Sequence, residues 1–96
     1  MSNRVVITGL GVVSPVGIGK DAFWDAMMTG KNGIDKITRF DATEYKAQVA
    51  GEVKDFEPAD YMDKKESKRI DRYAQFAVAA AKMAIEDAKL DLEAED

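Results

Sequence analysis

Four basic side chains in the second half of the chain have a spacing suited to binding an acidic partner. Lys65, Lys68, Arg69 and Arg72 stand at positions i, i+3, i+4 and i+7, with Lys64 beside them. On a continuous α-helix this spacing brings the four to one face. Clustered bases of this kind steer an acidic partner into contact, and their attraction weakens as salt is added.

The same stretch is also compatible with a solvated charged surface that binds nothing. Residues 60–72 contain five bases and four acids, for a net charge of +1, and the acids (Asp60, Asp63, Glu66 and Asp71) are interleaved with the bases. The bases stand in the first turns of the predicted helix, where the helix dipole favours acids. A departure from such a local rule can mark a functional surface. Composition alone leaves both interpretations open.

A second candidate site is the glycine-rich stretch near the start of the chain. Gly9-Leu10-Gly11-Val12-Val13-Ser14 partly matches the dinucleotide fingerprint G-x-G-x-x-G, but Ser14 replaces the third glycine and Pro15 follows at once. A P-loop also fails, because Gly19-Lys20 is followed by Asp21 and not by Ser or Thr. We therefore expect these glycines to permit a tight turn and close backbone packing, with a small nucleotide-binding βαβ domain as an alternative.

The composition excludes several classes of chemistry. The 96 residues include no cysteine and no histidine, so the chain cannot form a Cys–His or Ser–His–Asp nucleophilic site, and it lacks the usual ligands of structural zinc. A net charge of −4 argues against general nucleic-acid binding. No apolar run is long enough for a membrane span, and no secretory signal precedes Arg4. We expect a cytoplasmic protein without a cofactor or a membrane partner.

The apolar pattern of the first half predicts the elements that would position these residues. Val5-Val6-Ile7 is typical of a strand buried on both faces of a parallel sheet. A helix is predicted from about Asp21 to Thr29, with Gly30 as its C′ residue, so that strand, glycine loop and helix form half of a βαβ unit. The larger apolar side chains of this helix should pack against the sheet. They are Phe23, Trp24, Met27 and Met28.

The second half is predicted to contain one strand and one long helix. Residues 31–44 look irregular, and period-two alternation then predicts a strand from about Lys46 to Val53, with Gly51 marking a bulge or a close approach. Asp63-Lys64-Lys65-Glu66 has the form of a capping box, from which a single helix should run to about Lys89. That helix is apolar over most of its circumference, and two strands and two helices do not supply enough material to cover it. We therefore expect an incomplete domain that folds poorly alone.

These motifs together resemble a known family. Val5-Val6-Ile7-Thr8-Gly9-Leu10-Gly11, followed by Ser14-Pro15-Val16-Gly17, closely resembles the N-terminal signature of β-ketoacyl-acyl-carrier-protein synthases, the thiolase-fold condensing enzymes of fatty acid synthesis. The segment from Asp63 into the Ala-rich helix is similar to the type II bacterial enzymes in particular. The match continues in register through Trp24, Gly30, Gly33, Ile34, Phe40-Asp41, Ala50-Gly51, Asp55-Phe56 and Asp71-Arg72. The resemblance implies an α/β fold class, the N-terminal part of a thiolase-like fold, with residues 1–96 as a single truncated domain.

The resemblance also implies a reaction and a partner for a longer protein. In the family an acyl group passes from acyl carrier protein to a cysteine thiolate, and decarboxylated malonyl carrier protein then attacks it to give a 3-oxoacyl chain. The catalytic Cys and two His lie in later segments, so no catalytic residue is assigned here. In the family, bases at the start of this helix dock the acidic carrier protein, and the resemblance therefore implies Lys65, Lys68 and Arg69 as binding residues. A homodimer is expected for the full-length enzyme, and a non-catalytic module binding an acidic partner is the alternative.

Overall fold

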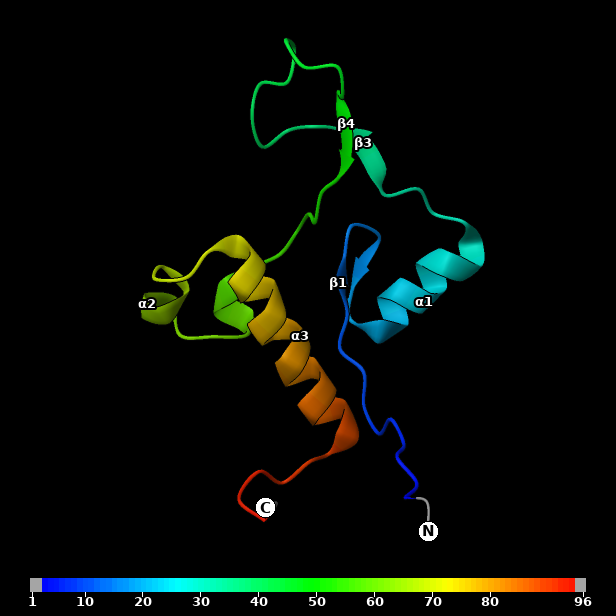
Figure 1. Cartoon of the computed structure of the whole chain (residues 1–96), viewed down its shortest axis with the longest axis vertical. Coiled ribbons are helices and arrows are strands. Elements are labelled where there is room, and N and C mark those ends of the chain that lie inside the picture. The colour runs from blue at the N-terminus through cyan, green and yellow to red at the C-terminus, as the bar shows by residue number, and fades with distance from the viewer. Residues whose placement is uncertain (1–2, 95–96) are drawn as a thin grey trace. The chain divides into compact units, whose positions relative to one another are not determined.

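The computed structural model describes residues 3–94, and these residues form two compact units. The hairpin unit consists of Val13–Phe56, and the helical unit combines residues 3–12 with residues 57–94. Figure 1 shows both units, with most of their helices and strands labelled. No helix among residues 3–94 is long and apolar enough to cross a bilayer.

Two short antiparallel pairs make up the β-structure of the hairpin unit. Strand β1 (Val13–Ser14) pairs with β2 (Gly17–Ile18), and β3 (Ile34–Lys36) pairs with β4 (Val49–Gly51). The strand predicted over Lys46–Val53 is confirmed in its centre as β4. The residues of β3 fall in a stretch predicted to be irregular, because three residues with loosely alternating charges carry little local strand signal.

Helix α1 (Lys20–Thr29) confirms the first predicted helix to within one residue. Gly30 ends it in the left-handed conformation, at φ 71°, as its identity predicts. The predicted packing is wrong for Trp24, Met27 and Met28, which are open to solvent, whereas Phe23 is half-buried. The exposed fractions are 63% at Trp24, 58% at Met27 and 69% at Met28. Ala26 is the one residue that α1 buries, since two-residue strands are too narrow to cover a helix face.

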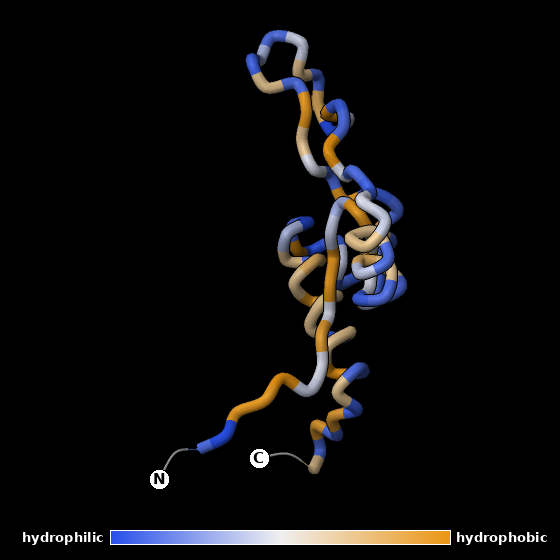
Figure 2. Tube along the Cα trace, turned by 90° about the vertical axis from the view of Figure 1, so that its right-hand side faces the viewer, coloured by the Kyte–Doolittle hydropathy of each residue, from blue (hydrophilic) through white to orange (hydrophobic). Residues whose placement is uncertain are grey.

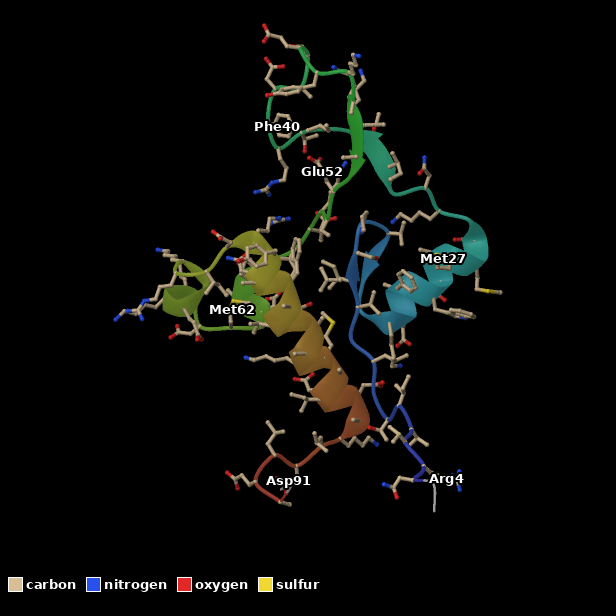
Figure 3. All side chains as sticks on the ribbon, in the orientation of Figure 1. Arg4, Met27, Phe40, Glu52, Met62 and Asp91 are labelled. Carbon is tan, nitrogen blue, oxygen red and sulfur yellow. The ribbon has the colours of Figure 1, made fainter. Side chains whose placement is uncertain are left out.

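A long loop joins β3 to β4, and Glu52 holds its first residues by hydrogen bonds. The Glu52 carboxylate accepts hydrogen bonds from Thr38 Oγ1 at 2.8 Å and from the backbone N–H groups of Thr38 and Arg39 at 3.1 Å. Figure 3 shows Glu52 beside the loop that carries Phe40. The Phe40 and Tyr45 rings meet edge to face, with centroids 5.8 Å apart. A carboxylate that accepts from several donors therefore fixes the first residues of this loop.

The helical unit starts with an extended segment that is not a strand. Val5, Val6 and Ile7 are 91%, 66% and 82% exposed, so the predicted buried strand is wrong for residues 3–94. A strand needs a neighbour for its backbone groups, and no described strand lies beside this segment. Its ties run instead to helix α3 (Arg72–Ala88), where Asp87 Oδ2 accepts a hydrogen bond from the Leu10 N–H at 3.0 Å.

The single long helix predicted from Asp63 to Lys89 is also wrong. The 3₁₀ turn η1 (Pro58–Asp60) is followed by the one-turn helix α2 (Lys64–Ser67), and α3 begins only at Arg72. Asp71 precedes α3 with extended backbone, at φ −71° and ψ 163°, which interrupts the helical path. Asp71 is therefore the N-cap of a new helix and not a residue inside a continuous one.

The buried residues of the described chain are few, and all but one of them are small. They are Ala26, Ala42, Met62, Ser67 and Ala79. Helix α3 buries only Ala79, and Tyr73 on the same helix is 75% exposed. Figure 2 shows apolar residues along the N-terminal segment as well. The expectation that two strands and two helices do not cover the long apolar helix is therefore confirmed.

Candidate functional site

The predicted binding residues lie on α2 and on the short linker that follows it. Lys65 belongs to α2, Lys68 is its C-cap, and Arg69 comes next; all three are exposed. Asp63 begins the turn as N-cap, with its carboxylate accepting from the Lys65 N–H at 3.4 Å. Figure 3 shows side chains with nitrogen tips projecting outward from α2. We call Lys65, Lys68 and Arg69 the basic cluster.

The basic cluster includes fewer residues than the helical spacing predicts. Arg72 lies beyond the break between α2 and α3, so the spacing that placed it on a shared face does not apply. Its guanidinium carbon stands 4.9 Å from the centroid of the Phe76 ring, at cation–π distance, and the residue is half-buried. Arg72 therefore serves the packing of α3, and the basic cluster consists of the other three bases.

Acidic side chains share the surface of the basic cluster. Lys65 and Arg69 line one shallow hollow of about 300 Å³ together with Asp63 and Glu66. Lys68 is exposed at the end of the same turn. Because both signs of charge are present, the surface favours a partner that brings several acids to it over a single small anion.

Buried and half-buried polar groups hold the inner side of α2. Ser67 is 9% exposed, its N–H donates to the Asp63 carbonyl at 2.9 Å, and its hydroxyl donates to the Lys64 carbonyl at 2.7 Å. From α3, Gln75 Nε2 donates to the Ser67 carbonyl at 2.8 Å. Neither Ser67 nor Gln75 was among the predicted site residues. The available signal for Gln75 was the single amide side chain among the few polar residues of an Ala-rich helix.

The glycine stretch is a packing site and not a ligand site. A Cβ built on Gly11 would lie 1.8 Å from the Ala80 carbonyl oxygen, and one on Gly9 would lie 2.3 Å from the Ala84 carbonyl oxygen. Backbone of α3 therefore occupies the space where a phosphate would need to sit against these glycines. The close packing predicted for them is confirmed, with α3 of the same chain as the neighbour.

The described residues offer no other reactive centre. Among residues 3–94 no three Asp or Glu side chains come together in a way that could hold a metal ion. A hollow of about 440 Å³ in the hairpin unit is lined by charges of both signs, and its Lys54 pairs with Asp35 at 3.8 Å. The basic cluster is therefore the candidate site that the geometry supports.

Comparison with protein families and relatives gives a consistent result. The model of the β-ketoacyl synthase N-terminal domain matches residues 2–96. The 3-oxoacyl-[acyl-carrier-protein] synthase 2 of Synechocystis sp. is 51% identical over 87 residues, and that of Staphylococcus aureus strain COL is 48% identical over 91 residues. These alignments take in 91% and 95% of this chain but 21% and 22% of the relatives. The chain spans about a fifth of the length of the curated relatives it matches.

Solved structures agree with these relatives. The ishigamide ketosynthase/chain length factor superposes with a TM-score of 0.83 at 39% identity, over 92% of this chain and 22% of its own. A type II polyketide ketosynthase, solved in complex with its acyl-carrier protein, gives a TM-score of 0.69 at 33% identity, over 97% and 21%. Both are ketosynthases, which confirms the predicted fold class, α/β and the N-terminal part of a thiolase-like fold.

Proposed function

The chain belongs to the β-ketoacyl synthase family, and from this premise we propose that it is the N-terminal part of a 3-oxoacyl-[acyl-carrier-protein] synthase. The whole enzyme is an acyltransferase that elongates acyl chains in fatty acid biosynthesis by decarboxylative condensation of malonyl carrier protein with acyl carrier protein. Residues 1–96 form one portion of its N-terminal half. They hold none of the catalytic groups, since they include neither cysteine nor histidine.

The contribution that we assign to this portion is docking of the carrier protein. The observation that carries the proposal is the basic cluster, Lys65, Lys68 and Arg69, exposed on a turn whose inner side is packed at Ser67. A fixed group of exposed bases raises the rate of encounter with an acidic protein, while each exposed ion pair adds little affinity by itself. A related ketosynthase solved with its acyl-carrier protein supports this choice of partner.

Charge reversal in the family-length enzyme tests the docking proposal. We expect Lys65→Glu with Lys68→Glu to raise the KM for acyl carrier protein, with kcat little changed, because the lost interaction is made before the chemical step. The rise should shrink at high salt, which screens exposed charges. The KM for a small acyl thioester without a carrier protein should stay at the parent value.

A matched double variant controls for the change in net charge. Lys36→Glu with Lys46→Glu reverses two exposed lysines of the hairpin unit and alters the total charge by the same amount. This variant should keep the parent KM for carrier protein. Equal KM values for the Lys65 and Lys68 variant and the parent would refute the docking proposal.

A second candidate is a non-catalytic module that binds an acidic partner through the same basic cluster. The observation in its favour is that the cluster and its supports at Ser67 and Gln75 lie within this chain, whereas the catalytic groups do not. Titration of the 96-residue chain with acyl carrier protein at two salt concentrations tests it. Saturable, salt-sensitive binding is the expected result, and no binding at low salt would exclude this candidate.

We further infer that the family-length enzyme is a cytoplasmic homodimer that needs no cofactor and has no nucleic-acid or membrane partner. The family resemblance supports the dimer and the location, and the net charge of −4 supports the absence of a nucleic-acid partner. Light scattering of the purified family-length protein tests the dimer.

A further inference from the structure

Helix α2 is too short to be stable without contacts from the rest of the protein. It consists of one turn, Lys64–Ser67, and a single turn fixes several backbone angles for few hydrogen bonds. The carbonyl groups at the end of such a turn also lack partners within the helix. The position of the basic cluster therefore depends on contacts from outside α2.

Gln75 supplies such a contact at the start of the linker that carries Lys68 and Arg69. Its side-chain Nε2 donates to the carbonyl of Ser67, the last residue of α2, at 2.8 Å. Its backbone N–H donates to the carbonyl of Asp71, the N-cap of α3, at 3.0 Å, which is the ordinary first hydrogen bond of an α-helix. The side chain of Gln75, held on α3, therefore fixes the end of α2.

The arrangement leaves the charged side chains free to meet a partner. Gln75 is half-buried and Ser67 is buried, whereas the basic cluster is exposed. Gln75 is also neutral, so it holds the turn without pairing with the bases or altering the charge of the surface. Its contact therefore acts on the position of the basic cluster and not on its charge.

We propose that Gln75 is a positioning residue for carrier-protein docking, which acts by holding α2 and its linker against α3 through the Ser67 carbonyl. The inference rests on the proposed docking function of the basic cluster. The partner that the basic cluster would bind is an acidic protein surface. Such a surface contacts several bases at once, so its binding is sensitive to the relative positions of those bases.

Replacement of Gln75 by methionine in the family-length enzyme tests the proposal. Met is close to Gln in length and shape but has no donor for the Ser67 carbonyl. Loss of one hydrogen bond of ordinary net strength corresponds to a roughly three- to tenfold rise in KM for acyl carrier protein. We expect kcat, and the KM for a small carrier-free thioester, to stay at parent values.

A variant in the hairpin unit separates positioning from a general loss of stability. Thr38→Val removes one side-chain hydrogen bond, from Thr38 Oγ1 to Glu52 at 2.8 Å, without a large change in shape. Its melting temperature should fall as in Gln75→Met, while its KM for carrier protein stays unchanged. A Gln75→Met enzyme that melts earlier but keeps the parent KM would overturn the proposal and leave Gln75 a structural residue.

A double-mutant cycle shows whether Gln75 acts through the basic cluster. In a background with Lys65→Ala and Lys68→Ala, Gln75→Met should raise KM by clearly less than it does in the parent, because the residues it positions are gone. An equal rise in both backgrounds would overturn the proposal. If charge reversal raises KM and Gln75→Met does not, only the positioning role fails; if neither does, the docking function fails.

A second variant keeps the proposal testable if Gln75→Met does not fold. Gln75→Ala removes the same donor to the Ser67 carbonyl with a small residue of the highest helix propensity, which overlaps with no neighbour. A raised carrier-protein KM at unchanged kcat supports the proposal, and an unchanged KM contradicts it.

Discussion

Gly11→Ala should destabilise the family-length protein more than an ordinary glycine-to-alanine change. The new Cβ would stand 1.8 Å from the Ala80 carbonyl oxygen, 2.8 Å from the Ala80 carbonyl carbon and 2.9 Å from the Ala84 nitrogen. All three atoms belong to the backbone of α3, so no side-chain rotation relieves the overlap. Ordinary contact begins at 3.4 Å, so the N-terminal segment would have to move by 1.6 Å at this point.

The expected loss follows from the overlap and from the contact that such a movement breaks. Overpacking costs about 1–3 kcal/mol. The displacement would also break the bond from the Leu10 N–H to Asp87, at 3.0 Å, for about another 1 kcal/mol. Alanine also lowers the conformational entropy of the unfolded chain, which offsets roughly 0.4–1 kcal/mol of this destabilisation. We therefore expect the free energy of unfolding to fall by about 1–4 kcal/mol, from the overpacking, hydrogen-bond and entropy ranges together.

Chemical denaturation of the parent and two variants measures this loss. Gly51→Ala is the matched control, because its new Cβ would meet the Pro15 ring at 3.1 Å and the tip of Ile34 at 3.2 Å, which are side-chain atoms that can yield. Its cost should stay below about 1 kcal/mol. Adding Ala80→Gly should not rescue Gly11→Ala, because the clash is with the Ala80 backbone. A Gly11→Ala protein as stable as the parent would refute the packing described for this segment.

Two further changes have defined outcomes. Gly30→Ala should lower the free energy of unfolding by roughly 1 kcal/mol, because Gly30 ends α1 at φ 71°, where a Cβ is strained; a melting curve that coincides with the parent's would contradict this. Glu52→Gln should make stability less sensitive to acid. The Thr38 hydroxyl, with backbone N–H groups and Lys54, holds the pKa of Glu52 below its ordinary value of 4.5. A lowered folded-state pKa stabilises above the unfolded value and loses that effect as pH falls through the folded value. The gap in melting temperature between parent and Glu52→Gln should therefore be constant from neutral pH to about pH 5 and close below the ordinary glutamate pKa. A gap that widens in acid would show that Glu52 has a raised pKa.

Local signals in the sequence gave reliable predictions where a structural feature is stabilised by residues close together in the chain. The end of α1 at Gly30 depends on one residue that accepts a positive φ, and the start of α2 at Asp63 depends on one side chain two positions from its partner. The exposed bases of the candidate site were also identified, because charged side chains rarely bury themselves without a partner.

Predictions failed where the energy depends on residues far apart in the chain. Strand formation at Val5–Ile7 needs neighbouring strands, and the described residues supply none beside it. The break between α2 and α3 involves a hydrogen bond between Gln75 and Ser67, eight positions apart, which no periodic pattern encodes. The same break removed Arg72 from the predicted basic face. The fold class was nevertheless predicted correctly from the resemblance to a family. Similarity over the whole chain implies the same fold, including the contacts between residues far apart in the chain.

The tie between Leu10 and Asp87 has a consequence for synthesis on the ribosome. The two residues are 77 positions apart, and translation at 5–20 residues per second separates their appearance by about 4–15 s. During that interval the segment that carries Gly9 and Gly11 has been made without α3, the helix against whose backbone these two glycines pack. The contact between this segment and α3 can therefore form only after residue 87 has been added to the chain.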